Sequence, residues 1–186
     1  MRKTVVILTI MLIYVIYSYP IAECENNQTY QPDCFTQDDL SVINKSNNII
    51  LKYGMEREEA EELLGNAKED FLGCNIYDDL IIGYRNNKIV GLTIVFTSGK
   101  IANFITPRGI SGSCKLNDVI ANYGKGLVRD NTITYWLEER EQGLISVPHE
   151  QIKDQRKAYV LYFTFDNHDS LSRVYIMDYH FGKYMK

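Results

Sequence analysis

The stretch GMEREEAEELLG, residues 54–65, decides the fold that we expect for this chain. Its first turn carries Glu56, Glu58 and Glu59, and acidic side chains are favoured at the positive end of a helix dipole. Leu63 and Leu64 extend a narrow apolar stripe, and the glycine that follows is a common helix terminator. We therefore expect a short helix over residues 56–64, with its glutamates facing solvent.

A looser copy of this stretch follows at residues 112–124, with the sequence GSCKLNDVIANYG. It predicts a second helix over residues 115–123, again ended by a glycine. Both stretches are followed by sequence rich in β-branched and aromatic residues. The predicted fold class is therefore α+β, with two tandem repeats of a helix plus an antiparallel meander, at residues 48–106 and 107–186.

Alternating apolar residues and short turns indicate three strands after each helix. A turn as short as Arg85-Asn86-Asn87 makes neighbouring strands antiparallel. A polar insertion, residues 139–156, interrupts the second repeat. The expected strands are residues 80–84, 88–96 and 100–106 in the first repeat, and residues 132–138, 157–165 and 171–180 in the second.

The N-terminus has the pattern of a secretory leader. Two basic residues precede an apolar run that ends near Ala22. Pro20 stands where a cleavage site usually has a small residue, so a retained membrane anchor remains an alternative to a cleaved signal peptide. We expect residues 1–22 to be this signal peptide or anchor, residues 23–47 to be a polar linker, and the rest to be extracytoplasmic.

Four cysteines, an even number, fit an oxidising compartment. The sequence favours a Cys24–Cys34 bridge in the linker and a Cys74–Cys114 bridge between the repeats, while other pairings and free thiols remain open. Lipidation of Cys24 is a weaker alternative, because Glu23 occupies a position that a lipoprotein signal reserves for a small residue.

Charge and residue spacing argue against several classes of ligand. The net charge is −4 and no cluster of Lys and Arg occurs, so we do not expect nucleic acid as a partner. The cysteines lack the close spacing of a zinc site, and no metal or other cofactor is predicted.

The glycine-bounded helix carries a resemblance to a known architecture. Residues 54–65 resemble the helix motif of the β-lactamase inhibitor protein-like fold, which small outer-membrane assembly lipoproteins share. The second repeat is similar to the second-repeat signature of uncharacterised exported Gram-positive proteins. Together the resemblances cover roughly residues 49–180, although Glu56 replaces the usual Ser or Thr cap. They imply a non-enzymatic protein that binds other proteins through an open sheet face.

Aromatic residues on the second repeat are candidates for such a binding face. Alternation places Tyr135, Leu161 and Phe163 on one side of the strands, where they would form core. The opposite side combines aromatic, methionine and arginine side chains, as protein-binding hot spots do. Intramolecular cover of this side, by the first repeat, the insertion or the N-terminal tail, is the competing interpretation. The predicted partner-binding residues are Trp136, Tyr162, Arg173, Tyr175, Met177 and Tyr179.

The main functional hypothesis is thus an exported, non-enzymatic binding or inhibitory module at the bacterial cell envelope, touching the membrane only through its N-terminus. One alternative is an extracytoplasmic hydrolase that uses Asp178 and His180, which alternation would place on one strand face. Another is a structural component of the envelope or spore coat.

Overall fold

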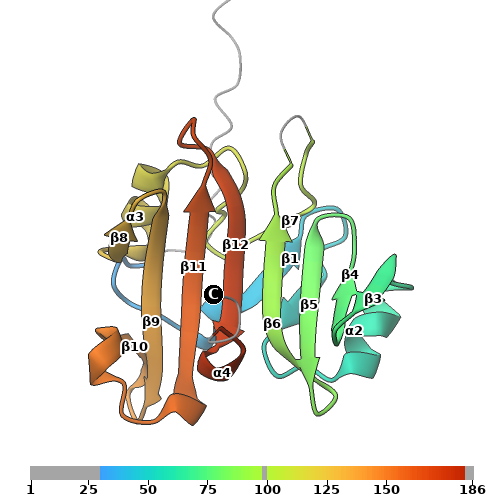
Figure 1. Cartoon of the computed structure of the whole chain (residues 1–186), viewed down its shortest axis with the longest axis horizontal. Helices are drawn as coiled ribbons and strands as arrows, with labels where there is room; N and C mark the ends of the chain where they lie inside the picture. The colour runs from blue at the N-terminus through green and yellow to red at the C-terminus, as the bar shows by residue number, and fades with distance from the viewer. Residues whose placement is uncertain (1–29, 98–99, 183–186) are drawn as a thin grey trace, which may run out of the picture.

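The structure, a computed structural model, describes residues 30–97 and 100–182. It has a mixed α+β fold in which antiparallel strands predominate, which confirms the predicted α+β class (Figure 1). The leader predicted at residues 1–22 lies outside the described residues.

A main sheet of nine antiparallel strands forms the body of the described chain. Strand β8 (Leu127–Arg129) pairs with β9 beside β10 and completes the set. The other strands, in their order across the sheet, are β10 (Gly143–Ser146), β9 (Thr132–Arg140), β11 (Ala158–Phe165), β12 (Leu171–Asp178), β6 (Lys88–Val95), β5 (Leu80–Arg85), β4 (Cys74–Ile76) and β3 (Glu69–Phe71).

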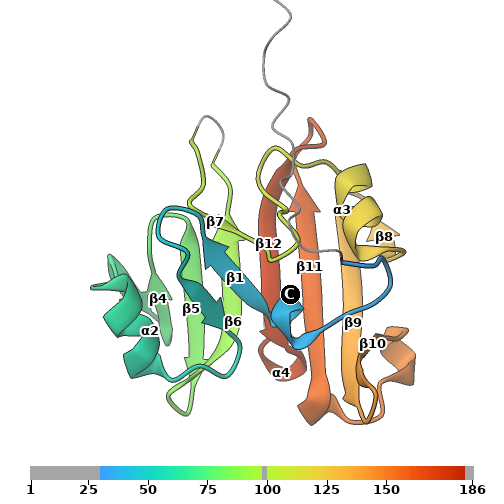
Figure 2. The ribbon, with the colours of Figure 1, turned by 180° about the vertical axis from the view of Figure 1, so that it is seen from behind.

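A second, smaller sheet has the order β2 (Ile50–Lys52), β1 (Ser41–Asn44) and β7 (Phe104–Ile105). Figure 2 shows this sheet on the same side of the main sheet as the helices α2 (Arg57–Leu64) and α3 (Leu116–Tyr123). We call this covered side the inner face and the opposite side the outer face. The remaining helical segments are α4 (Tyr179–Gly182) and the 3₁₀ turns Gln37–Leu40, His149–Gln151 and Gln155–Lys157.

Both predicted helices are present and end as expected. Gly65 and Gly124 have φ values of 75° and 87°, and their N–H groups donate to Glu61 and Ile120 carbonyls. Such backbone angles are strained for any residue with a Cβ. Glu56 makes no side-chain capping hydrogen bond, as its departure from Ser or Thr suggests.

The inner face carries the core that alternation predicted. Tyr135, Leu161 and Phe163 are at most 1% exposed and belong to one cluster with residues of α3 and the small sheet. A buried ion pair ties the N-terminal segment to this core. All five guanidinium N–H groups of Arg108 are used, on Asp39 at 2.7 and 2.8 Å and on the carbonyls of Gln31, Cys34 and Asn122.

Two expectations about the chain path are wrong. Residues 100–106 do not form a third meander strand, because β6 already pairs with β5 on one side and β12 on the other. Only Phe104–Ile105 is extended, and it pairs with β1 in the small sheet. Residues 30–47, expected as linker, instead supply β1 and the buried side chains of Leu40 and Val42.

Candidate functional site

The outer face is organised in rows of residues that run across the strands. The register aligns Trp136, Val160, Met177, Gly91, Gly83 and Cys74 in one row. The adjacent row contains Thr134, Tyr162, Tyr175, Thr93, Ile81 and Ile76. The predicted binding residues on β9, β11 and β12 therefore share one face, as alternation requires.

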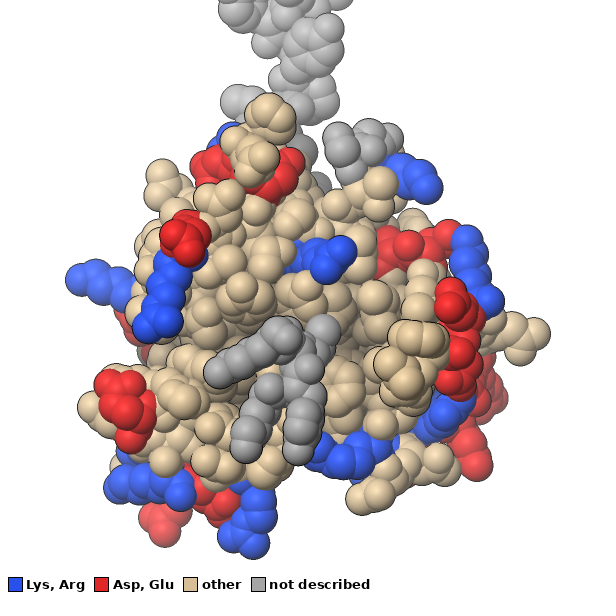
Figure 3. Space-filling view, in the orientation of Figure 1, with Lys and Arg blue, Asp and Glu red and all other residues tan. Residues whose placement is uncertain are grey.

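Three of the predicted residues form a contiguous accessible group, which we call the tyrosine–arginine group. The rings of Tyr162 and Tyr175 lie 5.5 Å apart between centroids, and both side chains are half-buried. Arg173 is exposed, and its Nη1 donates to the Tyr175 hydroxyl at 3.2 Å. Figure 3 shows acidic and basic residues mostly around the margin of this side of the molecule.

The insertion and the chain's C-terminal turn cover the other predicted residues in part. His149, from the insertion, packs on the Trp136 ring at 4.4 Å between centroids, and its Nε2 lies 3.2 Å from the Tyr179 hydroxyl. Met177 is only 4% exposed. Cover by the insertion was one expected alternative, whereas cover by α4 was not foreseen. The first repeat's strands extend the sheet edge to edge and do not lie over this face.

The last strand ends earlier than predicted, at Asp178. Its carboxylate accepts hydrogen bonds from the Phe181 N–H at 2.7 Å and the Tyr53 hydroxyl at 3.2 Å, and pairs with Arg85. Burial raises the pKa of the Tyr53 phenol, and the negative charge of Asp178 raises it further. Because the chain turns into α4 at Tyr179, Tyr179 and His180 do not continue the strand.

These contacts bear on the hydrolase alternative. It requires Asp178 and His180 on one strand face, and the strand no longer includes His180. Asp178 is 3% exposed and its carboxylate already holds Arg85, Tyr53 and the start of α4. Its geometry serves to fix the C-terminal turn.

The predicted bridge between Cys74 and Cys114 is wrong. No disulfide joins these residues, since Cys74 lies on the outer side of β4 while Cys114 is buried in the core before α3. The Cys114 sulfur accepts the Ser111 N–H at 3.4 Å. Cys34 is exposed, and its predicted partner Cys24 lies outside the described residues.

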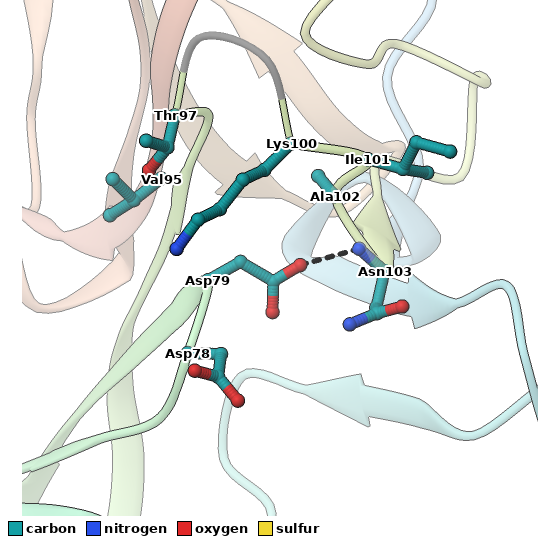
Figure 4. Close-up of a pocket in the computed structure, with 8 residues that line it drawn as sticks. All are labelled: Asp78, Asp79, Val95, Thr97, Lys100, Ile101, Ala102 and Asn103. Carbon is teal, nitrogen blue, oxygen red and sulfur yellow. Dashed lines mark hydrogen bonds between the residues drawn. The ribbon is translucent and has the colours of Figure 1, made fainter.

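A hollow of about 170 Å³ lies where β5 and β6 meet the connection to β7 (Figure 4). Its carboxylates already have partners within the chain. Asp79 accepts the Asn103 N–H, as the dashed line in Figure 4 marks, and Asp78 pairs with Lys68. These contacts therefore hold the connection between β6 and β7 in place, and the hollow presents no unpaired carboxylate to a ligand.

Sequence reasoning missed two glycines that the fold places at the centre of the outer face. Gly83 and Gly91 face each other across β5 and β6, and the ring of Phe181 lies on them. Glycine inside a strand can mark a close approach of another group, so the signal was present in the sequence.

The chain matches no family model, no curated protein and no solved structure. Among residues 30–97 and 100–182, no group of three or more His, Cys, Asp or Glu is placed to hold a metal ion. Within the same residues, no helix has the length and apolar character needed to span a membrane.

Proposed function

We propose that this chain is a non-enzymatic protein-binding or inhibitory module, and that its partner docks on the outer face of the main sheet. The observation that carries the proposal is the tyrosine–arginine group. Tyr162, Arg173 and Tyr175 are neighbours on a sheet face that α4 and the insertion cover elsewhere, at Met177 and Trp136.

The chemistry of this group favours a protein partner. Tyr and Arg are enriched among the residues that contribute most to protein–protein binding. Tyrosine offers a large apolar surface and a hydroxyl with few rotatable bonds, so ordering it on binding costs little entropy. Charged residues around the margin of this face, as in Figure 3, match the polar rim of an interface.

The order of elements supports the proposed duplication at residues 48–106 and 107–186. Helix α2 is followed along the chain by β3, β4, β5 and β6, and α3 by β8, β9, β11 and β12 once β10 is set aside. In space the two sets meet at the β6–β12 pair and run outward in opposite directions. Two copies of one module, joined at their last strands, account for this mirrored order.

Export to the bacterial cell envelope belongs to the same proposal and rests on the leader-like sequence of residues 1–22. The partner would then be an extracytoplasmic protein. Cleavage of that segment releases the module, and its retention tethers the module to the membrane.

A photo-crosslinking experiment tests the docking face. A photoreactive phenylalanine analogue is placed at position 162 or 175, and for comparison at Leu63, an α2 residue that is 40% exposed. In cells that produce the chain, both outer-face positions should crosslink to the same protein and position 63 should not.

The crosslinked protein is then purified and its affinity measured directly. Arg173→Glu should weaken binding about tenfold or more while the free energy of unfolding stays within about 0.5 kcal/mol of the wild type. Equal crosslinking from position 63, or unchanged affinity of the Arg173 variant, would contradict the proposed face.

A further inference from the structure

The paired glycines Gly83 and Gly91 make a notch in the outer face. A Cβ added to Gly83 would stand 2.3 Å from Phe181 Cζ, and one added to Gly91 would stand 2.7 Å from Phe181 Cε1. Real Cβ atoms do not approach other atoms so closely. The ring of Phe181 therefore rests directly on the backbone of two neighbouring strands, and the notch has the size of one aromatic ring.

The two glycines of the notch make the strands less stable, and the sheet itself gives no reason for their presence. Glycine in a strand interior removes a side chain that would pack and increases the entropy lost on folding. The neighbours of this pair, Ile82 and Leu92, are buried apolar residues that suit strands well. Two glycines directly opposite each other are thus explained by the group that lies on them.

The group that lies there is held by a short attachment. Phe181 belongs to α4, a single turn of four residues close to the chain's end. Its ring is only half-buried, whereas Phe163 on the inner face is fully buried. The Phe181 N–H donates to the side-chain carboxylate of Asp178 at 2.7 Å.

We propose that the Gly83–Gly91 notch is a binding site for one aromatic side chain, which Phe181 occupies until a phenylalanine or tyrosine of the partner replaces it. The inference rests on the proposed function and identifies one anchor of that interface. Because the ring of Phe181 already fits the notch, we expect the side chain that the partner inserts to be aromatic as well.

The notch is continuous with the tyrosine–arginine group. Gly91 pairs with Met177, and two residues further along the same strands Thr93 pairs with Tyr175. A partner that covers Tyr175 and Tyr162 therefore reaches the notch across one row of the sheet.

The test uses the full chain with Phe181→Ala, which empties the notch, and the probe is the acetylated and amidated tetrapeptide of sequence YHFG. A twin peptide, YHAG, lacks the ring. Binding is followed by the ring-current shifts of the Gly83 and Gly91 backbone signals and by the fluorescence of Trp136, the only tryptophan, which lies 5.8 Å from the Tyr179 ring.

The variant should bind YHFG about 10- to 100-fold more tightly than YHAG, because only the former buries an aromatic ring. Adding Gly91→Ala to the Phe181→Ala chain should remove that difference, since the new methyl group fills the notch. In the wild-type chain, YHFG should move the glycine signals only at higher concentration, because it competes with Phe181.

Equal affinity for the two peptides, or no effect of Gly91→Ala, would overturn the proposal. If Phe181→Ala fails to fold, the ring is part of the core and the proposal is also overturned; wild-type glycine signals that YHFG never perturbs would overturn it as well. Peptide binding in the notch without crosslinking at positions 162 and 175 would leave the notch standing and remove the proposed function. Crosslinking at positions 162 and 175 without peptide binding would leave the proposed function standing and remove the notch as a binding site.

Discussion

The two faces of the main sheet differ in what the chain itself supplies to cover them. On the inner face, α3, α2 and the small sheet bury a continuous cluster in which Leu161 and Phe163 have no exposed surface. On the outer face, the same strand β11 presents Tyr162 half-exposed, and among the described residues the cover comes from α4 and part of the insertion. The inner face therefore stabilises the fold, and the outer face is the one on which we propose that a partner docks.

The largest effect is expected at the buried ion pair of the inner side. Arg108→Ala should lower the free energy of unfolding by about 3–5 kcal/mol, because Asp39 is left as an uncompensated buried charge. Denaturant titration measures this loss. Arg85→Ala is the matched control and should cost clearly less, because the Arg85 side chain is 45% exposed and Asp178 keeps the Tyr53 hydroxyl and the Phe181 N–H as donors. Equal losses would remove the contrast between the two ion pairs.

Adjacent positions on β11 compare the two faces most closely. Leu161→Ala should cost about 2–5 kcal/mol, as buried leucine truncations do. Tyr162→Ala should cost about 1 kcal/mol or less, because it loses mainly the contact with Tyr175. A loss at Tyr162 as large as that at Leu161 would mean that the outer face is core.

A smaller, pH-dependent effect is expected at Glu138, which holds the insertion against the outer face. The Asp154 N–H, the Arg140 guanidinium and the Lys153 N–H hold the pKa of Glu138 below its usual range. A carboxyl whose pKa is lowered by folding adds stability above its unfolded pKa of about 4.3, and this stability is lost as pH falls through the folded pKa.

Glu138→Gln should therefore reduce stability at neutral pH and flatten the fall in stability below about pH 4.3. Denaturant midpoints measured from pH 7 down to pH 3 give the comparison. An unchanged slope in acid would show that Glu138 does not hold the insertion electrostatically.

The smallest effect concerns the rates at which the free cysteines react, and the free energy of unfolding should stay unchanged. In a Cys24→Ser chain, Cys34 should react fastest with a thiol reagent, Cys74 more slowly, and Cys114 only on unfolding, following their exposure. Burial also raises the pKa of the Cys74 thiol, which lowers its thiolate fraction. Mass spectrometry that found Cys74 bonded to Cys114 would contradict the structure.

The sequence predicted the elements whose signals are local. The two helices end at Gly65 and Gly124, where the backbone angles favour glycine, and the turn at Asn86-Asn87 has φ values of 51° and 62° at its two asparagines, as a tight hairpin requires. Long strands such as β9 and β11 followed from alternation. These features depend on a few neighbouring residues and can be identified without knowing the fold.

The missed features depend on contacts between distant segments. The short strands β3, β4 and β8 have three residues each, too few for alternation to be visible. The path of residues 100–106 and the separation of Cys74 from Cys114 are set by which strands become neighbours. The cover of Met177 by α4 depends on Asp178, whose contacts with Tyr53 and Arg85 turn the chain away from the strand. Export and partner binding remain predictions.

Partner docking on the outer face is tested most sharply by pairing two quantities on one variant, Tyr162→Ala with Tyr175→Ala. Once the crosslinked partner is purified, its affinity and the free energy of unfolding are measured for this double variant and the wild type. We predict that affinity falls at least about tenfold while stability falls by no more than about 2 kcal/mol. Unchanged affinity, or a loss of stability as large as that of Leu161→Ala, would contradict docking on this face.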